Sequence, residues 1–174
     1  LGLNRFSTTS AAQIFLKTCV LAVGLVCFVL IPLFLGQWVE WRGGFSLPTI
    51  MNGICLGIGV GLAEELIFRG WLWNELNCFF GFRKSTFFQA IIFSFAHVGA
   101  LVKDDLDFLE LCLLLFGLFL LGLVLALRRI LDHGSLIGCI GIHGGLVGIW
   151  FLSNFVFLDI YSNIPTIFIG PGSL

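Results

Sequence analysis

The chain has 174 residues, of which 59% are hydrophobic and 11% are charged. Soluble domains contain about 45–50% apolar and about 25% charged residues, so this composition predicts an integral membrane protein. The formal net charge of -1 offers no basic surface for phosphates, which argues against a nucleic-acid-binding module. The six cysteines form no Cys-x-x-Cys pair and suit apolar helix positions.

Apolar segments of about the 20 residues needed to cross a bilayer follow one another along the chain. They cover residues 14–36, 47–77, 85–100, 106–127 and 136–156. We therefore expect an all-α fold, a polytopic bundle of about five transmembrane helices, in a single domain over residues 1–174. The tail after Phe157 is expected to be a loop. Because the chain starts at Leu1 and ends after an apolar stretch, we expect a fragment lacking helices at one or both ends.

Positive charges gather in alternate loops between these segments. They occur before or at the start of the first segment, between the second and third, and between the fourth and fifth: Arg5 and Lys17, Arg83 and Lys84, Arg128 and Arg129. By the positive-inside rule, the N-terminus and these two loops face the cytoplasm.

The second segment contains three charged residues, Glu64, Glu65 and Arg69. An ionisable side chain near the bilayer centre costs at least about 2.5–3.5 kcal/mol on insertion scales, so such a cluster indicates a functional site. At about 100° per residue, Arg69 lies about 40° from Glu65 and about 140° from Glu64. This phase predicts a Glu65–Arg69 pair and leaves Glu64 as base or ligand. The alternative is a buried ion cluster that only fixes helix packing.

Two histidines in later apolar segments have a depth similar to that of Glu64. With about 1.5 Å of rise per residue, Glu64 lies about 20 Å, His97 about 18 Å and His143 about 15 Å from the cytoplasmic ends of their segments. The matched depth predicts one shared site. Either histidine alone is equally well explained as a hydrogen-bonded helix contact. His133 follows charged residues in a loop and is expected to be solvated.

Small residues recur at helical spacing near these polar groups. Gly53, Gly57 and Gly61 lie in the second segment, and Gly141, Gly144, Gly145 and Gly148 lie in the last. Such small-xxx-small faces let membrane helices approach closely, so we expect the Glu64 helix to pack on the His143 helix. The alternative is that glycine is merely frequent in membrane helices.

Two imidazoles and a carboxylate are a recognised ligand set for Zn²⁺. A Zn²⁺ held by His97, His143 and Glu64 would lower the pKa of its bound water towards about 7 and polarise a carbonyl group. In the metal-free alternative, Glu64 is the base and a histidine donates to the oxyanion. The sequence contains no His-Glu-x-x-His motif, so both alternatives stay open.

Three ordered motifs resemble those of the CAAX protease and bacteriocin-processing family, also called CPBP or Abi. They are Glu-Glu-x-x-x-Arg from Glu64 to Arg69, Phe-x-x-x-His from Phe93 to His97, and the glycine-flanked His143. The resemblance covers about residues 47–150, and we expect the family-like core at about 47–156. It implies an intramembrane, glutamate-dependent peptidase, commonly described as a metalloprotease.

The resemblance also implies roles for these residues. Glu64 would activate the attacking water, assisted by His97 and His143, while Glu65 and Arg69 would shape the site. The family's last motif is often His-x-x-x-Asn, whereas this chain has Val147 at the fourth position. The oxyanion donor would then be the backbone, another side chain or a metal, or activity would be lost.

The leading hypothesis is therefore an endopeptidase for membrane-embedded or membrane-proximal protein tails, including lipidated ones. Its expected partners are membrane lipid and a membrane-associated protein or peptide, with no nucleic acid. One alternative is a non-catalytic scaffold or immunity protein of the same fold, which Val147 favours slightly. An ion transporter would also place these residues at mid-membrane, but we find no internal repeat typical of that class.

Overall fold

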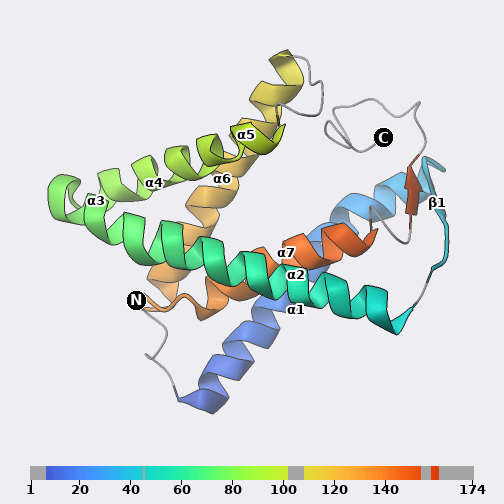
Figure 1. The fold of residues 1–174 in the computed structure, drawn as a ribbon, viewed down its shortest axis with the longest axis horizontal. Coiled ribbons are helices and arrows are strands. Elements are labelled where there is room, and N and C mark those ends of the chain that lie inside the picture. The colour runs from blue at the N-terminus through green and yellow to red at the C-terminus, as the bar shows by residue number, and fades with distance from the viewer. Residues whose placement is uncertain (1–6, 45, 102–107, 154–157, 161–174) are drawn as a thin grey trace.

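The computed structural model describes residues 7–44, 46–101, 108–153 and 158–160. These residues form the predicted helical bundle with one small antiparallel sheet (Figure 1). The elements in chain order are α1 (Thr8–Leu35), β1 (Val39–Trp41), α2 (Leu47–Glu65), the π-helix η1 (Leu66–Leu72), α3 (Trp73–Phe80), α4 (Phe82–Ala96), α5 (Val98–Leu101), α6 (Phe108–Leu131), α7 (Ile137–Leu152) and β2 (Leu158–Ile160).

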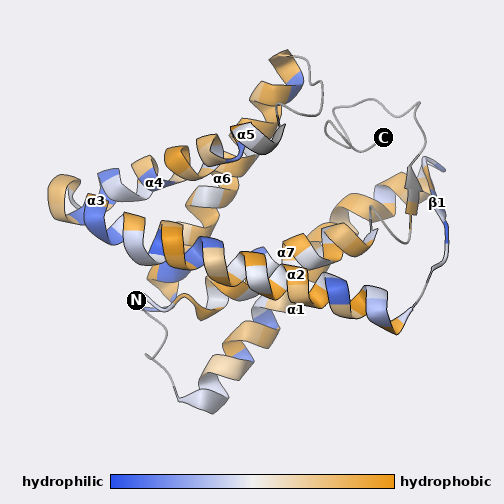
Figure 2. Ribbon diagram, in the orientation of Figure 1, coloured by the Kyte–Doolittle hydropathy of each residue, from blue (hydrophilic) through white to orange (hydrophobic). Residues whose placement is uncertain are grey.

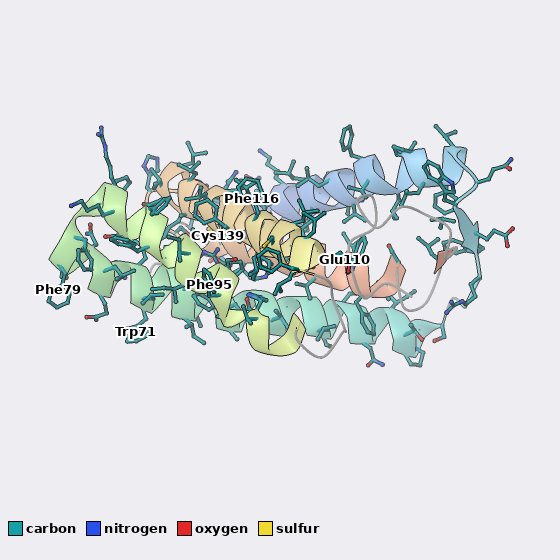
Figure 3. The ribbon with its side chains drawn as sticks, turned by 90° about the horizontal axis from the view of Figure 1, so that it is seen from above. Trp71, Phe79, Phe95, Glu110, Phe116 and Cys139 are labelled. Carbon is teal, nitrogen blue, oxygen red and sulfur yellow. The ribbon has the colours of Figure 1, made fainter. Side chains whose placement is uncertain are left out.

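The bundle has the apolar exterior of an integral membrane protein. Three helical stretches are long and apolar enough to span a bilayer: Thr8–Leu35, Leu47–Phe80 and Phe108–Leu131. Hydrophobic residues dominate the helices in Figure 2, many large ones are exposed, and Trp71 and Phe79 project outward in Figure 3. The expected number of about five spans stays a prediction, because α4 has 15 residues and α7 has 16.

The structure differs from the predicted elements in the following details. The second segment continues without a break to Phe80, but its hydrogen bonding changes to a π-helix at Leu66. The third predicted helix ends at Ala96, so His97 is its C-cap and not an interior residue. Part of the expected C-terminal loop is strand β2, which pairs with β1. The rest of that tail lies outside the described residues.

Helix α7 packs between α2 and α1, which Figure 1 shows beside it. Glycines allow the approach to α2, because a Cβ atom added at Gly144 would lie 2.6 Å from the Gly57 carbonyl oxygen. A Cβ atom added at Gly61 would lie 2.8 Å from the Gly144 Cα. The predicted close packing of these two helices is confirmed. It places the end of α2 beside the middle of α7.

An adjoining face of α7 contacts α1 through two other glycines. A Cβ atom at Gly141 would collide with the Thr18 hydroxyl, and one at Gly145 would lie 2.7 Å from the Ala22 Cβ. The Thr18 hydroxyl donates to the carbonyl of Ile14 at 2.9 Å, so it brings no unsatisfied donor into the bundle. Helix α7 is therefore held by both α1 and α2, which fixes the position of its single histidine.

We expect the substitution Gly144→Ala to destabilise the fold. The new methyl group would meet the Gly57 backbone, and overpacking of this kind typically costs about 1–3 kcal/mol. The free energy of unfolding in detergent micelles measures the effect. Gly59→Ala is the matched control, because a Cβ atom at Gly59 meets nothing within 4 Å. Equal destabilisation by both substitutions would contradict the close packing.

Candidate active site

Four elements bring the predicted polar residues into one cluster. Glu64 and Glu65 end α2, Arg69 lies in η1, His97 caps α4, and His143 lies in the middle of α7. The structure therefore brings together all five residues that the sequence motifs indicated. His133 does not join them, because it is exposed in the turn between α6 and α7, as predicted.

Glu65 and Arg69 form the ion pair predicted from helical phase. The Arg69 Nη1 donates to the Glu65 Oε1 at 2.8 Å, and both side chains are fully buried. The guanidinium also donates through Nη2 to the Gly122 carbonyl on α6 at 3.4 Å. Its Cζ atom lies 4.1 Å from the centre of the Phe93 ring. These contacts compensate a charge that would be very costly if it were unpaired inside the bundle.

His143 is joined to the same carboxylate oxygen. Its Nδ1 lies 2.7 Å from the Glu65 Oε1. An ionised carboxylate only accepts hydrogen bonds, so we assign the Nδ1 proton to this contact. The opposite ring nitrogen, Nε2, then faces Glu64. Glu65 thereby sets both the orientation and the tautomer of His143, as a carboxylate does for a catalytic histidine.

His97 has an equivalent orientation with a different partner. Its Nδ1 lies 2.7 Å from the Phe93 carbonyl oxygen, one turn earlier in α4. Because a carbonyl can only accept, the Nδ1 carries the proton and the Nε2 is left for the site. That Nε2 lies 3.6 Å from the Glu64 Oε2. Two imidazoles thus direct the same type of nitrogen towards one carboxylate.

Glu64 lies between the two histidines. Its Oε2 is 3.8 Å from the His143 Nε2, slightly farther than from His97. Both distances exceed the usual 2.7–3.2 Å of a direct hydrogen bond, and they are short enough for one small molecule to bridge the groups. The Oε2 is buried and makes no hydrogen bond within the described part of the chain. Glu64 and His97 each keep 27% of their side-chain surface exposed, so the edge of the site is accessible although the Oε2 is buried.

Phe93 forms the wall between these groups. It is fully buried, and its ring makes edge contacts with His97 at 4.8 Å and with His143 at 5.7 Å between ring centroids. The Arg69 guanidinium lies over the same ring. The Phe-x-x-x-His spacing therefore places one aromatic ring against three polar side chains of the site.

The cluster contains the types of ligand that Zn²⁺ prefers. Among the described residues, however, no group of three or more His, Cys, Asp or Glu side chains is arranged to hold a metal ion. Two imidazole Nε2 atoms and one carboxylate oxygen without a hydrogen bond meet here. Each Nδ1 is also engaged by a carbonyl or carboxylate, as is usual for metal-ligating histidines. The metal stays a prediction.

Sequence reasoning missed two contributions to this cluster. The hydrogen bond between His143 and Glu65 joins residues 78 positions apart, so no local sequence pattern predicts it. The contact of the Gly122 carbonyl with Arg69 could not be predicted either, because this carbonyl is a backbone group in an apolar helix. It also accepts a hydrogen bond from Gln89, whose polarity in an apolar segment was the available signal.

Comparison with known proteins identifies one family. The family model described as type II CAAX prenyl endopeptidase, Rce1-like, matches residues 44–149, which is more than half of the chain. No curated protein and no solved structure matches the chain. The matched region contains every residue of the cluster.

We expect Arg69→Leu to unfold the protein far more readily than the substitution Arg128→Leu. Breaking a buried pair from one side leaves an uncompensated charge and typically costs about 3–5 kcal/mol. The Arg128–Asp132 pair has the same i,i+4 spacing, but the Arg128 side chain is 26% exposed. Denaturant titration in micelles measures both. An equal loss for the two variants would show that the Glu65–Arg69 pair has no special structural weight.

Proposed function

Because the chain belongs to the Rce1-like family of type II CAAX prenyl endopeptidases, we propose that it hydrolyses peptide bonds with Glu64 as the general base. Membership makes it a membrane protease whose substrates are membrane-associated proteins. The observation that supports the role of Glu64 is the convergence of the His97 and His143 Nε2 atoms on its Oε2, at 3.6 and 3.8 Å.

In this mechanism a water molecule bridges Glu64 and His97. The Glu64 Oε2 takes one proton while the water oxygen forms a bond to the carbonyl carbon of the scissile peptide. The electron pair of the carbonyl double bond moves to its oxygen. When the C–N bond breaks, the proton held by Glu64 passes to the leaving nitrogen. The His97 Nε2 accepts a hydrogen bond from the second water hydrogen, which stays on the attacking oxygen, and so orients the attack.

His143 has a different role because of its partner. The Glu65 carboxylate lies 2.7 Å from the His143 Nδ1. Glu64 and Glu65 together carry two negative charges against the one positive charge of Arg69, so a second proton on the His143 ring makes the cluster neutral. The Nε2–H can then donate to the oxyanion of the tetrahedral intermediate. This assigns to His143 the stabilisation that Val147 cannot give. Glu65 and Arg69 act on the reaction through His143.

Zn²⁺ is the proposed cofactor in the alternative form of this site, where His97, His143 and Glu64 would hold it and it would supply a Lewis acid. Dialysis against a chelator separates the two forms. Cleavage that survives metal removal assigns the metal-free form. Loss of cleavage that is restored by Zn²⁺ assigns the metal form.

We propose protein tails anchored to the membrane by a lipid as the substrate class. The exterior of the bundle is apolar, with large exposed hydrophobic side chains such as Phe28 and Phe116. A substrate that shares the bilayer can therefore approach without leaving lipid. The partial exposure of Glu64 and His97 gives it access to the edge of the site.

The substitution Glu64→Gln is expected to lower kcat by about 10²–10⁴-fold, the range that a positioned general base contributes. The assay is cleavage of a prenylated peptide by purified protein in lipid vesicles, followed by mass spectrometry. Glu75→Gln is the control, because Glu75 is an exposed carboxylate in α3 of the same helical stretch. Undiminished cleavage by the Glu64 variant would refute the assignment.

A non-catalytic scaffold of this fold is the second candidate function, and Val147 is the observation that favours it. Val147 follows His143 by one turn of α7, and its side chain offers no donor to an oxyanion. If the wild-type chain cleaves, Val147→Asn should raise kcat, by up to about tenfold, because a second donor is added. Cleavage by the asparagine variant alone would assign the natural chain to the scaffold class.

A further inference from the structure

Gln89 is a fully buried polar side chain that belongs to none of the sequence motifs. It lies in α4, and its Nε2 donates to the Gly122 carbonyl on α6 at 3.1 Å and to the Thr86 carbonyl at 3.2 Å. Both partners are acceptors, so the orientation of the amide is fixed with its nitrogen towards them. Gln89 therefore ties one carbonyl of α6 to α4.

The Gly122 carbonyl, which Gln89 binds, also contacts a residue of the candidate active site. Arg69 donates through Nη2 to the same Gly122 oxygen at 3.4 Å. The guanidinium of Arg69 is thus fixed by Glu65 at one end, by this carbonyl at the other, and by Phe93 across its face. A shift of the Gly122 carbonyl would release one of these three constraints.

The close approach of α4 and α6 makes this arrangement feasible. A Cβ atom at Gly122 would lie 3.0 Å from both the Cα and the Cβ of Ala90, the residue that follows Gln89. Ala90 is fully buried. The two helices are therefore in backbone contact beside Gln89, which lets its side chain reach across to the carbonyl.

A role in holding α4 against α6 does not by itself explain why a glutamine is buried at position 89. Its Oε1 is buried and has no hydrogen-bond partner within the described residues, and a buried polar atom in that state is destabilising. Ser94 joins the same two helices without that cost, since its hydroxyl donates to the Leu115 carbonyl at 2.6 Å. The distinctive feature of Gln89 is the acceptor that it shares with Arg69.

We propose that Gln89 is a positioning residue for the catalytic cluster. Its side chain holds the Gly122 carbonyl in place, and that carbonyl fixes the Arg69 guanidinium. Arg69 in turn orients the Glu65 carboxylate, and Glu65 orients the His143 ring. The inference rests on the proposed peptidase function, and it adds a residue from α4 and a carbonyl from α6 to the residues that the family motifs contain.

The test compares Gln89→Met with the matched control Ser94→Ala. Methionine keeps the length of glutamine and removes its donor. We expect kcat for the prenylated peptide to fall about tenfold in the Gln89 variant, as for other supporting hydrogen bonds, with KM unchanged. In the Ser94 variant both constants should match those of the wild type. A Gln89 variant with wild-type kcat overturns the proposal, as does an equal loss of kcat in both variants.

A second readout does not depend on catalysis. In protein labelled with ¹⁵N-histidine, the Nδ1 resonance of His143 should shift in Gln89→Met and stay unchanged in Ser94→Ala. If the wild type fails to cleave but this shift occurs, the peptidase function fails and the positioning role holds. If the wild type cleaves and the resonance does not move, the positioning role fails alone.

The variant Gln89→Glu covers the case in which the methionine variant does not fold. At low pH its protonated carboxyl group can donate to the Gly122 carbonyl, and at high pH the ionised group would repel that oxygen. We expect the ratio of the variant's kcat to the wild-type kcat to fall as the pH rises. A constant ratio across the pH range would overturn the proposal.

Discussion

The buried ion pair of Glu65 and Arg69 is the interaction on which the rest of the site depends. A guanidinium within an apolar bundle must be neutralised, and Glu65 does this at 2.8 Å with no exposure of either side chain. The same carboxylate oxygen holds the His143 Nδ1, so one atom both neutralises a charge and orients an imidazole. Glu64, its neighbour in sequence, is then free to face the Nε2 atoms of His97 and His143.

Close backbone contacts within two pairs of helices bring these groups together. Gly57 and Gly144 let α2 and α7 touch, while Gly122 and Ala90 do the same for α6 and α4. Each contact lies beside a polar residue of the cluster, so short polar side chains can reach across helices. The helix packing and the geometry of the site are therefore linked. Loosening the contact of α2 with α7, or that of α4 with α6, would separate the hydrogen-bond donors from the acceptors that stabilise the buried charges.

Sequence reasoning was most successful where the physics is local. The i,i+4 spacing gave the Glu65–Arg69 pair, and matched depth grouped Glu64 with both histidines. It failed for contacts that depend on how distant segments pack together. The bond between Glu65 and His143 depends on how α2 and α7 dock, and the π-helix after Glu65 has no signature in residue type. Strand β2 was missed because its three residues are too few to show a periodicity.

The most direct test of Glu64 as a base is a single turnover of wild-type protein on a prenylated peptide in H₂¹⁸O. General-base catalysis predicts one ¹⁸O atom in the new carboxylate of the product and none in the peptide that contains Glu64. A Glu64 peptide that gains ¹⁸O would show that the carboxylate attacks the substrate as a nucleophile. That result, or a wild-type chain that releases no product, would contradict the account.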